Sequence, residues 1–119
     1  MKKINLNKVP WIEQRSLKAT NFPMHAHSAE WEFYHVVSGT GTLRVNRRKV
    51  ALESGDCVMC PPGGAHQIIN TGKKDLFYYV IANNAPTEVW HYPDSKKWGS
   101  RAIGKFFRLQ EAGYFDGEE

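Results

Sequence analysis

The sequence alternates short β-prone runs with turn-forming segments, and this pattern constrains the fold more than any other feature. Six such runs follow one another through the middle of the chain, at residues 31–37, 42–45, 50–52, 57–60, 67–70 and 76–82. The segments between them are rich in Gly, Pro, Asn, Asp and Ser, which supply positive φ angles or close local hydrogen bonds. Short strands at this spacing predict an all-β fold, either an antiparallel sandwich or a barrel.

The run at residues 75–82 is apolar at both odd and even positions. Successive side chains of a strand point to opposite faces, so this run predicts a strand that is covered on both faces. Which of its two sets of side chains faces the core is left open. A second copy of the chain would cover the other face, and we therefore expect a homodimer.

Length and composition fit a single globular domain. The chain has 119 residues, of which 41% are apolar and 24% charged, and one core serves about 100–150 residues. We expect an N-terminal strand segment (1–24), a barrel core (25–84) and a C-terminal tail (85–119) whose many aromatic side chains pack on the barrel. Within the tail, residues 101–112 fit either an edge strand or a short helix.

Charge and hydropathy argue against nucleic-acid and membrane partners. The formal net charge is only +4, and the basic clusters fall at expected turns rather than along a helix face. No apolar run approaches the roughly 20 residues that span a bilayer. The first residues are basic but lack a following apolar stretch, so we expect no signal peptide and a cytoplasmic location.

Cys57 and Cys60 form a C-x-x-C pair, a spacing shared by redox and zinc sites. Here the pair lies in an expected strand that ends at a proline. Residues three apart in a strand point to opposite faces, so the two sulfurs would not reach one partner. We expect two reduced cysteines with no shared site.

Three histidines and a carboxylate form a candidate metal site. His25 and His27 are two residues apart, so on a strand they share a face and can reach a common ion. Glu32 follows, with Glu30 as an alternative, and His66 comes after a Pro-Pro-Gly-Gly-Ala turn that would direct it to the same interior. Three imidazoles and one carboxylate suit divalent iron, manganese, zinc, nickel, cobalt or copper.

These positions resemble the two sequence motifs of the cupin superfamily. The first, G-x5-H-x-H-x(3,4)-E-x6-G, is matched from His25 to Gly39, although Ala19 stands in place of the leading glycine. The second, G-x5-P-x-G-x2-H-x3-N, is matched at every motif position from Gly55 to Asn70. The resemblance implies a small single-domain bacterial cupin with a double-stranded β-helix, or jelly-roll, barrel.

The resemblance also implies the metal ligands, which are His25, His27, Glu32 and His66. It selects Glu32 over Glu30, because only Glu32 has the family's spacing to Gly39. Fewer residues precede His25 than most cupins use for their leading strands, so the barrel either begins short or borrows a strand from a second copy.

Strand parity indicates which other side chains line the cavity. If Glu32 and His66 point inward, so do Tyr34, Val36, Ile68 and Asn70. Tyr34 is then the best hydroxyl donor for a bound ligand and the candidate catalytic residue. His35 has the opposite parity and is expected to face away, in a structural role.

Four protein ligands leave one or two coordination positions open for a ligand. We therefore expect a metal-dependent enzyme that uses the ion as a Lewis acid or oxygen activator on a small carbonyl, carboxylate or sugar-like metabolite. Cupins include isomerases, decarboxylases, lyases and dioxygenases, and the sequence does not choose among these reactions. The alternative is a protein that binds or senses a small molecule without catalysis.

Overall fold

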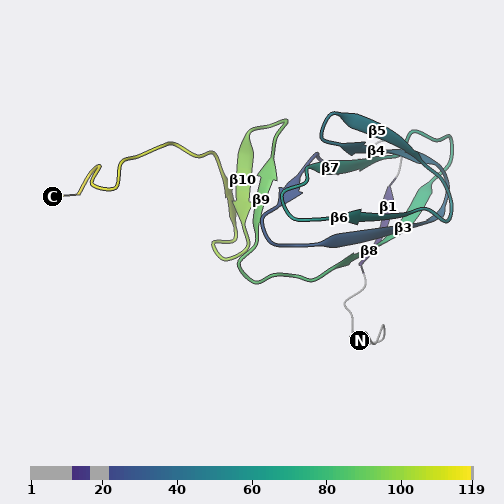
Figure 1. Ribbon diagram of the computed structural model, residues 1–119, viewed down its shortest axis with the longest axis horizontal. Helices are drawn as coiled ribbons and strands as arrows, with labels where there is room; N and C mark the ends of the chain where they lie inside the picture. The colour runs from purple at the N-terminus through teal and green to yellow at the C-terminus, as the bar shows by residue number, and fades with distance from the viewer. Residues whose placement is uncertain (1–11, 17–21, 119) are drawn as a thin grey trace.

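A computed structural model describes residues 12–16 and 22–118, which form strands joined by turns (Figure 1). The strands are β1 (Ile12–Ser16), β2 (Ala26–His27), β3 (Glu32–Ser38), β4 (Gly41–Val45), β5 (Arg48–Leu52), β6 (Cys57–Cys60), β7 (His66–Ile69), β8 (Leu76–Ala82), β9 (Val89–Tyr92), β10 (Lys97–Ser100) and β11 (Lys105–Phe107). Within these described residues there is no helix long and apolar enough to cross a membrane.

The strands form three sheets, and two of them enclose the core. One has the order β1-β8-β3-β6, and the second has the order β5-β4-β7. In Figure 1 these two sheets lie opposite each other. The buried apolar cluster takes its side chains from β3, β4, β5, β6, β7 and β8, so it fills the space between them. The expected all-β jelly-roll barrel is thus confirmed.

The pairing of β8 with β3 decides which side of β8 faces the core. Val80 lies opposite Tyr34, and Tyr78 lies opposite Val36. All four of these side chains are buried. Because paired residues point to the same face of a sheet, the even-numbered residues of β8 face inward and the odd-numbered ones face outward. Both the parity predicted for β3 and the open choice for β8 are resolved in this way.

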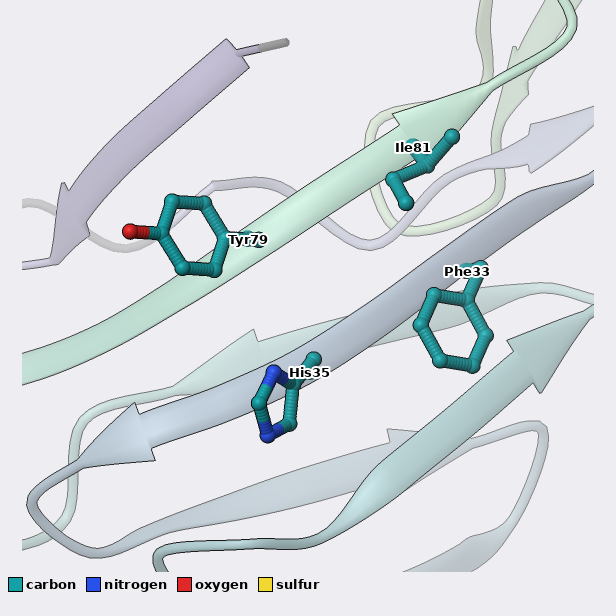
Figure 2. A pocket seen from close by; sticks show the side chains of 4 residues that line it. All are labelled: Phe33, His35, Tyr79 and Ile81. Carbon is teal, nitrogen blue, oxygen red and sulfur yellow. The ribbon is translucent and has the colours of Figure 1, made fainter. Parts of the chain in front are cut away.

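The outer face of the same sheet carries a second set of apolar side chains. Phe33, His35, Tyr79 and Ile81 line an open groove of about 500 Å³ there (Figure 2). His35 therefore points away from the core, as its parity predicted.

The two cysteines also separate as expected, because Cys57 is exposed, Cys60 is buried and both are free.

The edge of β8 is paired by a strand of the same chain. β1 runs antiparallel to β8, with Gln14 opposite Tyr78. The two alternatives for the N-terminal region, a barrel that begins short or a strand borrowed from a second copy, stay predictions. The rest of the expected N-terminal strand segment, residues 1–11 and 17–21, lies outside the described residues.

The third sheet has the order β11-β10-β9-β2 and joins the C-terminal region to the barrel. β9 pairs with β2, and β11 is the edge strand, so part of the ambiguous stretch 101–112 is a strand and not a helix. The packing of the tail on the barrel stays a prediction, although its last two aromatic side chains are exposed. Tyr114 is 90% exposed and Phe115 79% exposed, on a segment that extends away from the strands (Figure 1).

Candidate metal centre

The backbone of three segments brings the predicted ligands together. His25 and His66 face each other across an antiparallel bridge, in which each N–H donates to the other's carbonyl, at 3.1 and 2.8 Å. The turn before His66 is tied to β2 by a 2.7 Å hydrogen bond from the Gly63 N–H to the His27 carbonyl. Glu32 opens β3. Long-range pairing, and not local sequence, thus determines the separation of these side chains.

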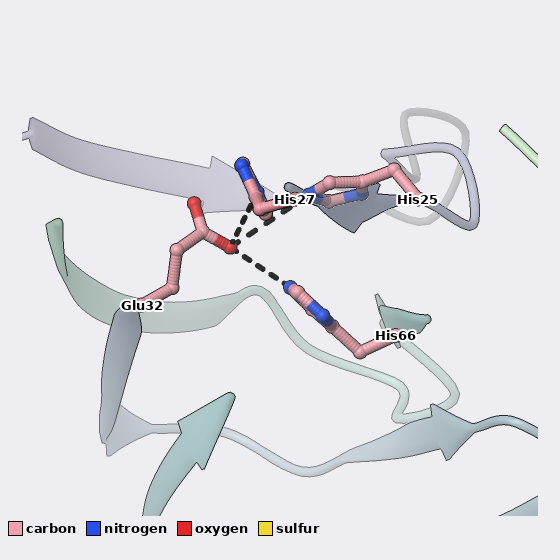
Figure 3. Close-up of side chains that lie close together, drawn as sticks. All are labelled: His25, His27, Glu32 and His66. Atoms are coloured by element: carbon pink, nitrogen blue, oxygen red, sulfur yellow. Dashed lines mark hydrogen bonds and ion pairs between the residues drawn. The ribbon is translucent and has the colours of Figure 1, made fainter. Parts of the chain in front are cut away.

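The four side chains converge on one carboxylate oxygen (Figure 3). The distances from Glu32 Oε2 to Nε2 are 3.7 Å for His25, 3.2 Å for His27 and 2.8 Å for His66. One ligand atom from each of the four residues lies within 4.8 Å of the others; His27 and His66 are buried, and His25 and Glu32 are partly buried. Such a cluster can hold a single ion.

The opposite ring nitrogen of each histidine is held by an acceptor. The acceptors of the three Nδ1 atoms are the Pro23 carbonyl (2.8 Å from His25), the Gly64 carbonyl (3.0 Å from His66) and Glu88 Oε1 (3.1 Å from His27). A carbonyl or a carboxylate only accepts hydrogen bonds. Each Nδ1 therefore carries a hydrogen and donates it, which assigns the tautomer of the neutral ring.

In these tautomers the neutral form of each ring directs its Nε2 lone pair at the Glu32 carboxylate. The buried Nε2 atom of His27 has no hydrogen-bond partner. Electron pairs and a negative charge at one point repel one another unless a cation lies between them. The donor set, with three imidazole nitrogens and one carboxylate, is one that divalent transition metals prefer. The residues present therefore fit a bound metal ion.

Electrostatics keep Glu32 ionised and its tyrosine neighbour neutral. Burial raises the pKa of Glu32, but side-chain hydrogen bonds, including the one that the Tyr34 hydroxyl donates, outweigh it, so this pKa lies well below its usual range. The Tyr34 hydroxyl donates to Glu32 Oε2 at 2.6 Å and lies 3.2 Å from His66 Nε2. Burial, and then the Glu32 charge, raise the pKa of Tyr34 far above its ordinary value, so Tyr34 remains a hydrogen-bond donor.

A small cavity adjoins the cluster. It measures about 70 Å³ and is lined by Phe22, His25, Glu32, Tyr34, Ile68, Tyr78 and Val80. One water needs about 10–15 Å³ of such space, so the cavity holds about five water-sized groups. Apart from the cluster and two tyrosines, its walls are apolar. Burial, followed by the Glu32 charge, raises the pKa of Tyr78 to about 12, so Tyr78 too stays protonated.

Two acidic residues beside His27 have roles that differ from the sequence-based expectations. Glu30, weighed as a rival ligand, lies with Oε2 3.2 Å from His27 Nδ1 and pairs through Oε1 with Arg101 at 2.5 Å. It thus lies on the far side of the His27 ring from the cluster. Glu88 was not foreseen, because it belongs to no motif and follows no recognisable spacing.

The histidine of the tail, His91, lies outside the cluster and stacks on Trp98, with 4.3 Å between the ring centroids.

Comparison with known proteins places the chain in a family. Residues 16–82, more than half of the chain, match the family model described as the cupin domain. This chain belongs to the cupin family. The match covers β2 to β8, and with them all four converging side chains, but it ends before Glu88 and the strands β9 to β11.

Among solved structures, this cupin resembles a provisionally named sugar phosphate isomerase from Acidithiobacillus ferrooxidans. The TM-score is 0.66 at 27% identity, over 86% of this chain and 70% of the other. It also resembles a predicted oxalate decarboxylase from Thermotoga maritima, with a TM-score of 0.59 at 27% identity, over 64% of this chain and 67% of the other.

Among curated proteins, the chain is 33% identical to the oxalate-binding protein of Thermotoga maritima over 58 residues. These residues make up 49% of this chain and 48% of that protein. The chain is 29% identical over 93 residues to auxin-binding protein 1 of Arabidopsis thaliana, 71% of this chain and 46% of that protein. The chain therefore spans about half the length of these two relatives.

Proposed function

We propose that this cupin binds one divalent transition metal through His25, His27, Glu32 and His66 and acts on a small carboxylate or carbonyl compound. The observation that carries the proposal is the convergence of three Nε2 atoms on Glu32 Oε2, with every Nδ1 atom facing an acceptor elsewhere. When bound, the metal supplies a Lewis acid that polarises an oxygen of the ligand.

The residues around the cluster provide the rest of the chemistry. The Tyr34 hydroxyl donates its one hydrogen to Glu32 Oε2 and lies beside His66, and on ligand binding it would transfer that hydrogen bond from Glu32 to a ligand oxygen in the cavity. Ile68 and Val80 form apolar walls that keep water from the ligand. Because the hydroxyl of Tyr34 is held neutral, we assign it the role of hydrogen-bond donor and not of base.

The size of the cavity favours a compact ligand. Space for about five water-sized groups suits a molecule of a few non-hydrogen atoms, such as a short mono- or dicarboxylate, better than a sugar-sized one. The relatives named as an oxalate-binding protein and a predicted oxalate decarboxylase support the same class of ligand. We therefore propose oxalate as the first compound to test.

Metal analysis tests the metal centre. Protein purified without an affinity tag should contain about one transition-metal ion per chain, and His66→Ala should contain none. His35→Ala removes a histidine from the outer face and serves as the control, with the metal content of the wild type. Wild-type protein that contains no metal, even after reconstitution with each candidate ion, would refute the proposal.

Binding without turnover is the second candidate function, and the names of the oxalate-binding and auxin-binding relatives favour it. Calorimetry with metal-loaded protein and oxalate measures binding, and assays for formate and carbon dioxide measure decarboxylation. Binding with product formation supports an enzyme, and binding without product supports the second candidate. Absence of binding would refute oxalate as the ligand.

The homodimer stays a prediction, and we propose the groove lined by Phe33, His35, Tyr79 and Ile81 as its interface. Among the side chains that the structure describes, those lining the groove include no Lys, Arg, Asp or Glu. It lies on the face of β8 that the core leaves open, so a second copy would complete the cover of this strand. Light scattering at micromolar concentration should give a dimer for the wild type and a monomer for Phe33→Glu. A wild-type monomer would contradict the proposal.

A further inference from the structure

Glu88 is a fully buried carboxylate that precedes β9 and lies outside the family match. Its two oxygens accept hydrogen bonds from four N–H groups. The donors are the backbone N–H groups of Ser28 (2.8 Å), Ala29 (3.0 Å) and Glu30 (3.0 Å) and the Nδ1–H of His27 (3.1 Å). Burial of an acidic side chain is unfavourable unless its charge is compensated, and these four donors compensate it.

One of these four donors belongs to a proposed metal ligand. His25 and His66 donate their Nδ1 hydrogens to backbone carbonyls, whereas His27 donates to a carboxylate. A carboxylate is the stronger acceptor, and such a partner both fixes the ring orientation of a ligating histidine and raises its basicity. Without Glu88, the hydrogen on Nδ1 would lose the partner that holds it there.

Of the two carboxylates near His27 Nδ1, Glu88 and not Glu30 forms the hydrogen bond with it. The Oε2 atom of Glu30 lies 3.2 Å from His27 Nδ1, but its other oxygen is held by Arg101 at 2.5 Å. Arg101 is itself fixed by a hydrogen bond to the Ala85 carbonyl at 2.6 Å. Both oxygens of Glu88 already accept hydrogen bonds from N–H groups, and Glu30 Oε1 accepts one from Arg101.

We propose that Glu88 is a positioning residue of the metal centre. It fixes His27 in the tautomer with hydrogen on Nδ1 and directs the Nε2 lone pair at the shared ion. The inference rests on the proposed metal-binding function. The segment that leads into β9, which lies outside the matched cupin region, then contributes to the metal centre.

Glu88→Gln tests this role because the amide replaces one oxygen with a donor. At the Oε2 position its NH₂ would face two backbone N–H groups, and at the Oε1 position it would face one backbone N–H and the His27 ring. Only the ring can move its hydrogen. We therefore expect the NH₂ to face His27, which would shift the hydrogen to Nε2 and block the atom that ligates the metal.

Two measurements test whether the hydrogen moves in this way. Nitrogen-15 NMR of the His27 ring in metal-free protein should show hydrogen on Nδ1 in the wild type and on Nε2 in Glu88→Gln. Titration with Zn²⁺ should show an affinity about 10–100-fold weaker in the variant. Ser28→Ala is the matched control, because it removes the 2.9 Å hydrogen bond from the Val89 N–H at the same junction without touching His27 Nδ1. It should keep the wild-type tautomer and affinity.

The outcomes separate this inference from the proposed function. If Glu88→Gln keeps hydrogen on Nδ1 and binds Zn²⁺ within twofold of the wild type, the positioning role is refuted. If the wild type binds no metal, the proposed function fails, and the tautomer measurement still decides whether Glu88 sets His27. Should Glu88→Gln not fold, Glu88→Asp shortens the side chain by one methylene and keeps the charge. Weaker Zn²⁺ binding then supports the role, and wild-type affinity refutes it.

Discussion

Metal binding should raise the melting temperature of this protein by an amount that can be calculated in advance. The four ligand atoms come from separate segments and meet only in the folded chain, so the ion binds the native state far better than the unfolded one. A free ion at 100 times its dissociation constant then stabilises the native state by about 2.7 kcal/mol. Unfolding entropy near 60 °C is about 2.1 cal/mol/K per residue, or about 0.25 kcal/mol/K for 119 residues. The expected rise is about 11 °C.

Scanning calorimetry with and without Zn²⁺, after removal of metal by a chelator, measures this rise. The comparison is made within each variant, so any loss of stability caused by the substitution itself cancels. His66→Ala loses a ligand whose Nε2 atom lies 2.8 Å from Glu32 Oε2, and its melting temperature should rise by less than about 2 °C. His35→Ala should show the full rise. A full rise in His66→Ala, or none in the wild type with any candidate ion, would refute the four-ligand site.

Three further predictions concern single side chains. Tyr34→Phe should lower the free energy of unfolding of metal-free protein by about 1.5–3 kcal/mol in urea denaturation, because the Glu32 carboxylate loses its 2.6 Å donor. An unchanged free energy of unfolding would contradict this contact. Iodoacetamide should label exposed Cys57 but not buried Cys60, as mass spectrometry can show, and equal labelling would be inconsistent with the packing of β6. Gly39→Ala should destabilise the protein by more than about 2 kcal/mol in the same urea assay, because φ is +88° and a Cβ there would overlap the Asp75 carbonyl oxygen. A neutral substitution would disprove this strain.

Strand positions and inward-facing residues could be predicted from the sequence because both depend on local geometry. Side chains alternate along a strand, so once Glu32 was placed inward, the burial of Tyr34 and the outward direction of His35 followed. The same rule could not choose a face for β8, whose odd and even positions are equally apolar. Its register against β3 made that choice, with Val80 opposite Tyr34.

The tail shows a second limit of sequence reasoning. Aromatic content predicted that the tail would pack on the barrel, but composition does not say whether a complementary surface is within reach. Trp90 finds such a surface in Phe106, at 6.0 Å between ring centroids, because β9 and β11 both pair with β10. Tyr114 and Phe115 follow the last strand and contact each other at 4.8 Å while remaining exposed.

By itself, the sequence determined the strand periodicity, the turn chemistry and the spacing of the two motifs that nominated the four candidate ligands. Only the tertiary structure decided that these four side chains meet, since an antiparallel bridge sets the separation of His25 and His66. It alone revealed Glu88, whose hydrogen-bond partners lie 58 to 61 residues away along the chain. The physical reason is that periodicity is a local property of the backbone. A buried carboxylate finds its donors, and a metal ion its ligands, only after distant segments have packed together.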